Sequence, residues 1–107
     1  MAHISFYSKT VDFKNATGSP LGFKTVSTEH TFDTKVLSGD VALKGFDVVY
    51  DSGTYDAVSS TGAEVTNVQP VGQTISCDVS LKLTDGDDTD LNLDASSAEV
   101  LFIAYCE

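Results

Sequence analysis

Residues 75 to 83 alternate strictly between apolar and polar side chains, and this period of two constrains the fold more than any other feature of the chain. Ile75, Cys77, Val79, Leu81 and Leu83 are each separated by one polar residue. Successive side chains of a β-strand point to opposite faces, whereas a helix would scatter the same residues around its axis. The pattern therefore predicts a strand with one face in a core and the other in water.

Similar short segments recur along the whole chain, separated by clusters of turn-forming residues. Examples are "HISFYS", "VSTEHTFDTKV", "VALKGFDVVY", "AEVTNV" and "AEVLFIAYC", with "NATGSP" and "QPVG" among the connections. Regularly spaced short strands without a helical period are typical of antiparallel sandwiches and open barrels. A length of 107 residues suits one domain. We therefore predict an all-β protein, a single antiparallel β-sandwich of about 6–9 short strands over residues 1–107.

The apolar residues of the first segment change parity. Ile4 and Phe6 occupy even positions, whereas Val11 and Phe13 occupy odd positions. If all four face one core, an extra residue must be inserted between them, because a shift of one residue reverses every side chain. We therefore expect a bend or β-bulge near residues 8–10.

Glycine marks two further expected irregularities. The stretch Ser38-Gly39-Asp40 is composed of turn formers and predicts a turn before the next strand. The apolar parity then changes between Leu43 and Phe46, and Gly45 lies at the change. A glycine inside a strand pattern is typical of a bulge, so one is expected at Lys44-Gly45.

The final apolar run, "VLFIA" at residues 100–104, lacks the alternation of the other segments. Its residues are apolar on both faces, which a sandwich with a solvated outer face does not require. Either a loop covers the second face, or that face is a subunit interface in a homo-oligomer. The predicted interface residues are Val100, Leu101, Phe102 and Ile103.

The charge of the chain excludes two classes of partner. Sixteen acidic and six basic side chains give a formal net charge of −10. Such a surface repels the phosphates of nucleic acids and of anionic lipids, so neither nucleic acid nor membrane is expected as a partner. The start "MAHISFYSKT" lacks the charged and apolar regions of a signal peptide, so we expect cytoplasmic synthesis without a cleaved signal.

The segment "DGDDTDLNLD" at residues 85–94 contains five aspartates and is the one candidate metal site. It lacks the glycine at position 6 and the glutamate at position 12 of an EF-hand loop. An irregular loop can still hold Ca²⁺ through carboxylate oxygens, and the candidate ligands are Asp85, Asp87, Asp88 and Asp90. The alternative is a solvated hairpin loop with a turn at its Asp-Gly step.

Cysteine, histidine and serine form no catalytic or redox motif. Cys77 shares the apolar parity of its segment, which predicts a buried free thiol, although a disulfide with Cys106 is the alternative if their strands are neighbours. His30 lies on the parity of Phe32 and is expected to be a core histidine, and His3 stands near the terminus. The chain also lacks a nucleophile elbow and a phosphate-binding glycine motif. We therefore expect a protein that is not an enzyme and that needs no cofactor other than the candidate Ca²⁺.

The order of segments between about residues 26 and 104 resembles that of the H-type lectin family. That order runs from "HTFDTKV" and "VALKGFD" through "VTNVQPVGQTISCDVSLKLTD" to a closing "FIA", with Phe102 where the family has tryptophan. The resemblance implies a trimeric antiparallel sandwich that binds galactose-type sugars, of a kind also found as structural parts of phage particles. The matching positions are Phe32, Val41, Leu43, Phe46, Asn67, Val68, Gly72, Asp85, Ile103 and Ala104.

Two functions are compatible with these features. The first is a structural subunit, a self-associating β-sandwich, expected to be a homotrimer, that builds or decorates a larger particle such as a phage capsid or tail together with other structural proteins. The second is an H-type-lectin-like protein that binds cell-surface glycans, with Ca²⁺ as a candidate aid. In that case Tyr50, Tyr55 and the aspartates of residues 85–90 are expected to meet the sugar.

Overall fold

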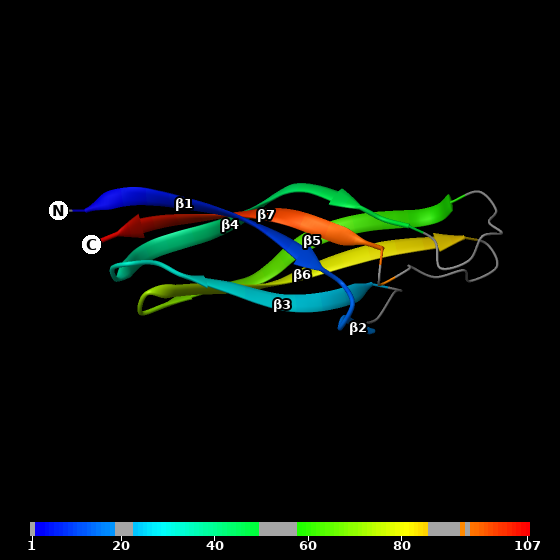
Figure 1. Cartoon of the computed structure of the whole chain (residues 1–107), viewed down its shortest axis with the longest axis horizontal. Helices are drawn as coiled ribbons and strands as arrows, with labels where there is room; N and C mark the ends of the chain where they lie inside the picture. The colour runs from blue at the N-terminus through cyan, green and yellow to red at the C-terminus, as the bar shows by residue number, and fades with distance from the viewer. Residues whose placement is uncertain (1, 19–22, 50–57, 86–92, 94) are drawn as a thin grey trace.

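Seven antiparallel strands in two packed sheets make up the fold, which a computed structural model describes for residues 2–18, 23–49, 58–85, 93 and 95–107 (Figure 1). One sheet has the order β1-β7-β4 and the other the order β2-β3-β6-β5. The prediction of an all-β fold with two packed antiparallel sheets is confirmed. The strands are β1 His3–Asp12, β2 Thr17–Gly18, β3 Lys24–Thr31, β4 Val36–Asp47, β5 Val58–Val71, β6 Thr74–Asp85 and β7 Ser97–Cys106.

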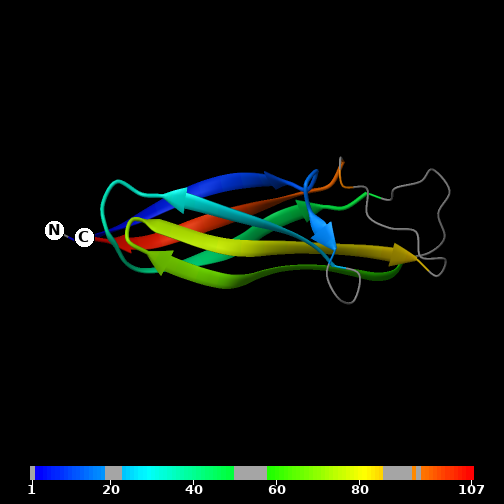
Figure 2. The same cartoon turned by 90° about the horizontal axis from the view of Figure 1, so that it is seen from below.

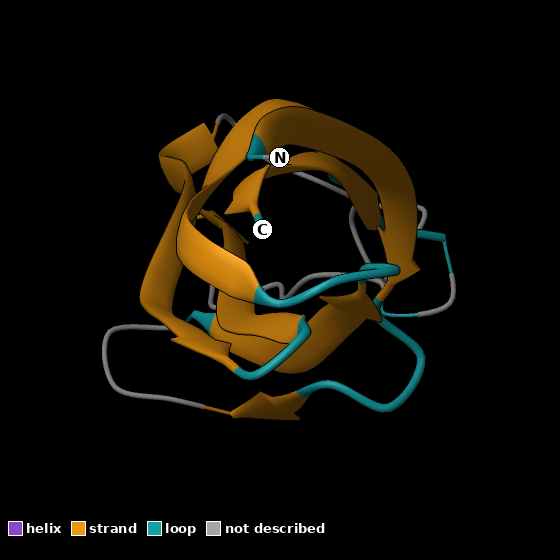
Figure 3. Cartoon of the chain, turned by 90° about the vertical axis from the view of Figure 1, so that its left-hand side faces the viewer, coloured by secondary structure: helices purple, strands orange, loops and turns teal. Residues whose placement is uncertain are grey.

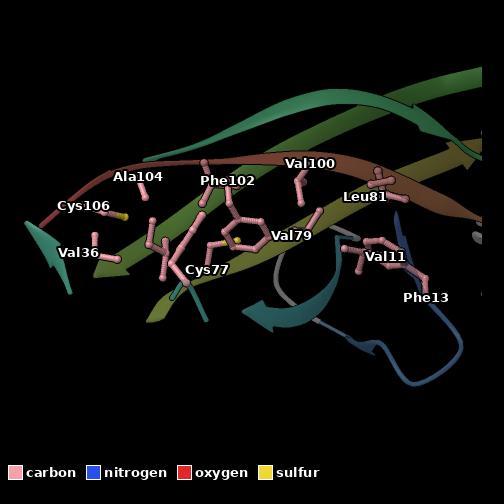
Figure 4. Packing of buried hydrophobic residues seen from close by; sticks show 14 of the residues in the cluster. Val11, Phe13, Val36, Cys77, Val79, Leu81, Val100, Phe102, Ala104 and Cys106 are labelled. Atoms are coloured by element: carbon pink, nitrogen blue, oxygen red, sulfur yellow. The ribbon is translucent and has the colours of Figure 1, made fainter. Parts of the chain in front are cut away.

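The core lies between β6 and β7, each of which is an inner strand of its sheet. The alternating residues of β6 from Ile75 to Leu83 are all buried, as their period of two predicts. They meet the inward side chains of β7, whose Val100 and Phe102 are fully buried (Figure 4). Cys77 and Cys106 are buried free thiols, so the predicted burial of Cys77 is confirmed and the two do not form a disulfide.

The sandwich is long and narrow, with principal extents of 55 × 21 × 20 Å. Both chain termini lie at one end of it, while β6 ends and β7 begins toward the opposite end (Figure 1). The view from below shows β3, β6 and β5 running side by side along this axis (Figure 2). Seen from the terminal end, the two sheets curve around a common interior (Figure 3).

The expected bulge in the first strand is wrong. β1 pairs with β7 over ten consecutive residues without a register shift, from His3 opposite Cys106 to Asp12 opposite Ser97. The parity change has a different cause, because Val11 and Phe13 are buried whereas Ile4 and Phe6 are exposed. The two apolar pairs therefore lie on opposite faces of this part of the chain, and no inserted residue is needed to bring them together.

The expected turn at Ser38-Gly39-Asp40 is also wrong, because β4 continues through these residues. The chain reverses earlier, between Thr31 and Val36, so the strand that was expected to reach Val36 ends at Thr31. Backbone hydrogen bonds from Phe32 N to Gln73 O and from Val36 N to Gly72 O, both 2.8 Å, hold that connection. The bulge predicted at Lys44-Gly45 is confirmed by a register shift between Leu43 and Gly45.

Gly39 has a packing role inside β4. It pairs with Ala104 of β7 and shares that residue's inward face, where the Ile75 side chain occupies the space that a Cβ would need. A Cβ would also lie 3.3 Å from the Ile103 carbonyl oxygen. A glycine is therefore required here for the close approach of the two sheets, not for a turn.

Gly39→Ala should lower the free energy of unfolding by about 1–3 kcal/mol, because the new methyl group overpacks a full core. Ile75→Val removes the overlapping Cδ1 and costs about 0.5–1.5 kcal/mol by itself. The double variant should lose less stability than the sum of the losses of the two single variants. Urea unfolding of the wild type, both single variants and the double variant measures this difference. Strict additivity would contradict the proposed overlap.

Candidate interaction surface

The outward face of the β1-β7-β4 sheet carries large apolar side chains at its terminal end. Direct partners in a sheet share a face, so the pairing register defines rows across the three strands. One row contains Ile4, Tyr105 and Ser38, the next contains Phe6, Ile103 and Asp40, and the third contains Ser8, Leu101 and Ala42. The outer apolar face is defined as Ile4, Phe6, Leu101, Ile103 and Tyr105.

Three members of the outer apolar face are exposed to an unusual degree for their size. Ile4 is 62 %, Phe6 63 % and Tyr105 46 % exposed. Leu101 and Ile103 are each partly exposed. Isolated apolar residues on a surface are ordinary, but these five occupy adjoining positions of paired strands. A contiguous patch of this kind is typical of a site of protein association.

The side chains of the outer apolar face project farther from the sheet on the β1 side, called here the high side, than on the β4 side, called the low side. Ile4 and Phe6 project from β1, whereas β4 contributes the short side chains of Ser38 and Asp40. A hollow of about 380 Å³ lies over this low side, and Ile4, Ile103 and Tyr105 form the rest of its wall. The Asp40 carboxylate accepts a hydrogen bond from Val41 N at 2.8 Å and is thus held close to its own strand.

The predicted interface residues divide between the two faces of β7. Val100 and Phe102 point into the core, where the chain itself covers them completely, so they are not available to a partner. Leu101 and Ile103 belong to the outer apolar face. Sequence reasoning missed Ile4, Phe6 and Tyr105 as members of this face. The parity change in the first strand was the signal for two of them.

Charged groups border the outer apolar face farther along the sheet. Lys44 Nζ lies 3.3 Å from Glu99 Oε1 and donates a hydrogen bond of 3.0 Å to Ser8 Oγ. This network connects all three strands of the sheet. The surface changes from apolar to charged between the rows of Leu101 and Glu99, which sets the boundary of the patch.

The candidate calcium ligands Asp87, Asp88 and Asp90 lie outside the described residues, as do Tyr50 and Tyr55. Asp85 is the last residue of β6. Among the residues that the structure describes, no group of three or more histidine, cysteine, aspartate or glutamate side chains could hold a metal ion. The calcium hypothesis thus remains a prediction from the sequence.

A second notable feature is the seam where the edge strand β1 approaches β3, beyond the two residues of β3 that pair with β2. The Tyr7 and His30 rings stack across it, with centroids 3.7 Å apart and an interplanar angle of 8°. Phe32 meets His30 edge-on at 4.7 Å. Lys9 Nζ donates a hydrogen bond of 3.0 Å to Glu29 O, which satisfies a carbonyl at the β3 edge. Side-chain contacts therefore bridge two strands that belong to different sheets.

At the terminal end the seam opens into a pocket of about 300 Å³. Phe6, His30, Phe32 and Asp33 are among its lining residues. Thr34 also lines the pocket, and its Oγ1 is buried without a hydrogen-bond partner. An unsatisfied buried hydroxyl carries a desolvation penalty, which a polar ligand or a water molecule in the pocket would relieve.

Burial affects two titratable groups near this region. Burial, and secondarily the charge of Lys9, lower the pKa of His30 below its ordinary 6.5, against a smaller opposing effect of Asp33. Burial, and secondarily Asp78, raise the pKa of the Cys77 thiol to about 11. His30 is therefore neutral at pH 7, and Cys77 is a protonated, unreactive thiol.

The chain matches no family model, no curated protein and no solved structure. Over the part of the chain that the structure describes, no helix is long and apolar enough to cross a membrane. The candidate sites are therefore defined by their geometry and chemistry.

The lowered pKa of His30 predicts a loss of stability in mild acid. The unfolded chain takes up a proton at His30 near pH 6.5 and the folded chain only at lower pH, so the free energy of unfolding should fall as pH falls through 6.5. His30→Phe preserves an aromatic stack with Tyr7 and removes this proton. Urea unfolding of both proteins at a series of pH values should show the wild type losing stability relative to His30→Phe below pH 6.5. Parallel curves would refute this role of His30.

Proposed function

We propose that this protein is a non-enzymatic structural subunit that associates with copies of itself through the outer apolar face and so builds or decorates a larger particle, such as a phage capsid or tail. The observation that carries the proposal is the cluster of exposed apolar side chains on one face of the β1-β7-β4 sheet, in which Ile4 and Phe6 are the most exposed. Exposed side chains of this size gain about 1.5–3 kcal/mol each when a partner buries them fully.

The overall charge favours this face over others for contact between copies. Two chains with a formal charge of −10 repel each other, so association requires a surface where few charges are brought together. None of the five members of the outer apolar face carries a charge. Asp40 is the charged residue in their rows, and its carboxylate is held by its own backbone. Contact at this face therefore combines apolar burial with little direct repulsion.

The shape of the molecule suits a subunit of a larger particle. The outer apolar face lies toward the end that holds both termini, and the sandwich extends 55 Å along its long axis (Figure 1). Contact at one end leaves most of the other sheet available to further structural proteins. The high fraction of residues in paired strands also supports a rigid building element rather than an adaptable one.

Phe6→Ser should weaken the self-association of this protein by about 10- to 100-fold in the association constant, because each contact between copies buries this ring. The measurement is sedimentation velocity over a wide concentration range. The fold should be retained, since Phe6 lies outside the core.

Val71→Ser provides the matched control. Val71 is 71 % exposed and lies at the end of β5 in the opposite sheet, so its replacement removes a similar exposed apolar side chain from another surface. It should associate as the wild type does. A wild-type protein that stays monomeric at the highest attainable concentration would refute the proposed function.

The pocket at the end of the seam favours a second function, the binding of carbohydrate. His30 and Phe32 offer ring surface, and Asp33 and Thr34 offer polar groups to sugar hydroxyls. The buried Thr34 hydroxyl has no hydrogen-bond partner in the described structure, and a sugar hydroxyl could supply one. Pockets near 300 Å³ are at the small end of ligand sites, which suits a single sugar unit. The earlier candidates Tyr50 and Tyr55 are not needed for this site.

Titration with methyl β-galactoside, followed by amide NMR shifts, tests the second function. Saturable shifts confined to residues 30–34 are expected if the pocket binds sugar, with at least a several-fold weakening in Thr34→Val, which removes the hydroxyl and keeps the shape. Thr31→Val is the control, because its hydroxyl is already bonded to Thr74 at 2.8 Å. Equal affinities in all three proteins would place the sugar elsewhere.

A further inference from the structure

We propose that two copies of this chain pair face to face through the outer apolar face about a two-fold axis parallel to β7, so that β1 of each copy packs over β4 of the other. This inference rests on the proposed self-association and specifies its geometry. It follows from the uneven height of the face, with projecting side chains on β1 and a hollow over β4.

An axis parallel to β7 brings unlike edges of the sheet together. A half-turn about it places β1 over the partner's β4 while every row stays at its own level along the strands. Ile4 then lies over the partner's Ser38, and Phe6 lies over the partner's Asp40, at the hollow of about 380 Å³. The projecting side of each copy thus fills the low side of the other, twice per pair.

The centre of the pair would consist of the outward residues of β7. Leu101, Ile103 and Tyr105 lie nearest the axis, so each packs against the same residue of the partner. Only apolar or aromatic side chains meet there. Glu99, at the border of the face, is paired with Lys44 of its own chain at 3.3 Å. Each copy therefore brings one positive and one negative side chain to this border, and their charges cancel.

The other two-fold arrangement fits less well. An axis perpendicular to the strands places each strand over its own copy in the reverse direction. Centred on Ile103, it stacks Phe6 on the partner's Phe6 and leaves the hollows facing each other. It also sets Asp40 opposite the partner's Asp40, and two close carboxylates repel. Both steric fit and charge therefore favour the parallel axis.

The size of the face determines how strong the pair should be. The stretch of β7 from Leu101 to Tyr105, at about 3.3 Å a residue, and three strands at about 4.8 Å give a face of roughly 15 by 15 Å. This is well below the roughly 800 Å² per partner of a standard specific interface, which suits a weak, reversible pair that forms at high protein concentration rather than a permanent dimer. The three-fold assembly implied by the lectin resemblance would require the face to meet a different surface.

Spin labels at Asp47→Cys distinguish these arrangements. Asp47 is exposed at the far end of β4, seven residues from Asp40. With the axis parallel to β7 the two labels lie at the same end of the pair, about 20 Å apart, whereas the reversed arrangement separates them by about 45 Å. Cys77 and Cys106 are buried and should not take up label. The distance is measured by double electron–electron resonance, alongside the mass by sedimentation.

A two-chain mass with a distance near 20 Å, lost when Phe6→Ser is added, supports the pair. A two-chain mass with a distance above about 40 Å overturns this geometry but leaves self-association in place. A three-chain mass overturns the two-fold pair and likewise leaves the proposed function standing. A monomer at every concentration overturns both, so the failure of the pairing model and the failure of the proposed function give different results.

Discussion

The packing of β7 on β6 is the interaction on which the rest of the structure depends. Each is an inner strand of its sheet, and each turns an unbroken row of buried side chains toward the other. Because side chains alternate between faces, fixing the inward row of a strand also fixes its outward row. The core therefore decides, indirectly, which residues face the surroundings on both sheets.

This coupling explains the outer apolar face. Once Val100 and Phe102 enter the core, Leu101 and Ile103 must point outward, and the register of β1 adds Ile4 and Phe6 beside them. A chain that needed only a stable core would have placed polar residues at these positions, as β3 does with Ser27 and Glu29. The exposed side chains of Ile4, Phe6 and Tyr105 are not buried within the described fold, and this is the observation behind the association between copies that we propose.

The seam between β1 and β3 shows how the molecule treats its open edges. Edge strands carry unpaired backbone groups and tend to pair with other chains. Here the Lys9 ammonium donates a hydrogen bond to the Glu29 carbonyl oxygen, and the Tyr7 ring stacks on His30. Charge and aromatic packing thus protect the edge from further strand pairing. The association that we propose therefore uses the face of the sheet rather than this edge.

The sequence by itself determined the fold class, the strand of residues 75–83, the burial of Cys77 and the bulge at Gly45, because each depends on local alternation or on a single glycine. Tertiary structure alone decided that Gly39 fits against Ile75 instead of making a turn, and that Ile4 and Phe6 lie opposite to Val11. A parity change looks the same in sequence whether a strand bulges or carries apolar residues on both faces. Only the unbroken register with β7 separates the two, because pairing between distant segments fixes which face meets the core.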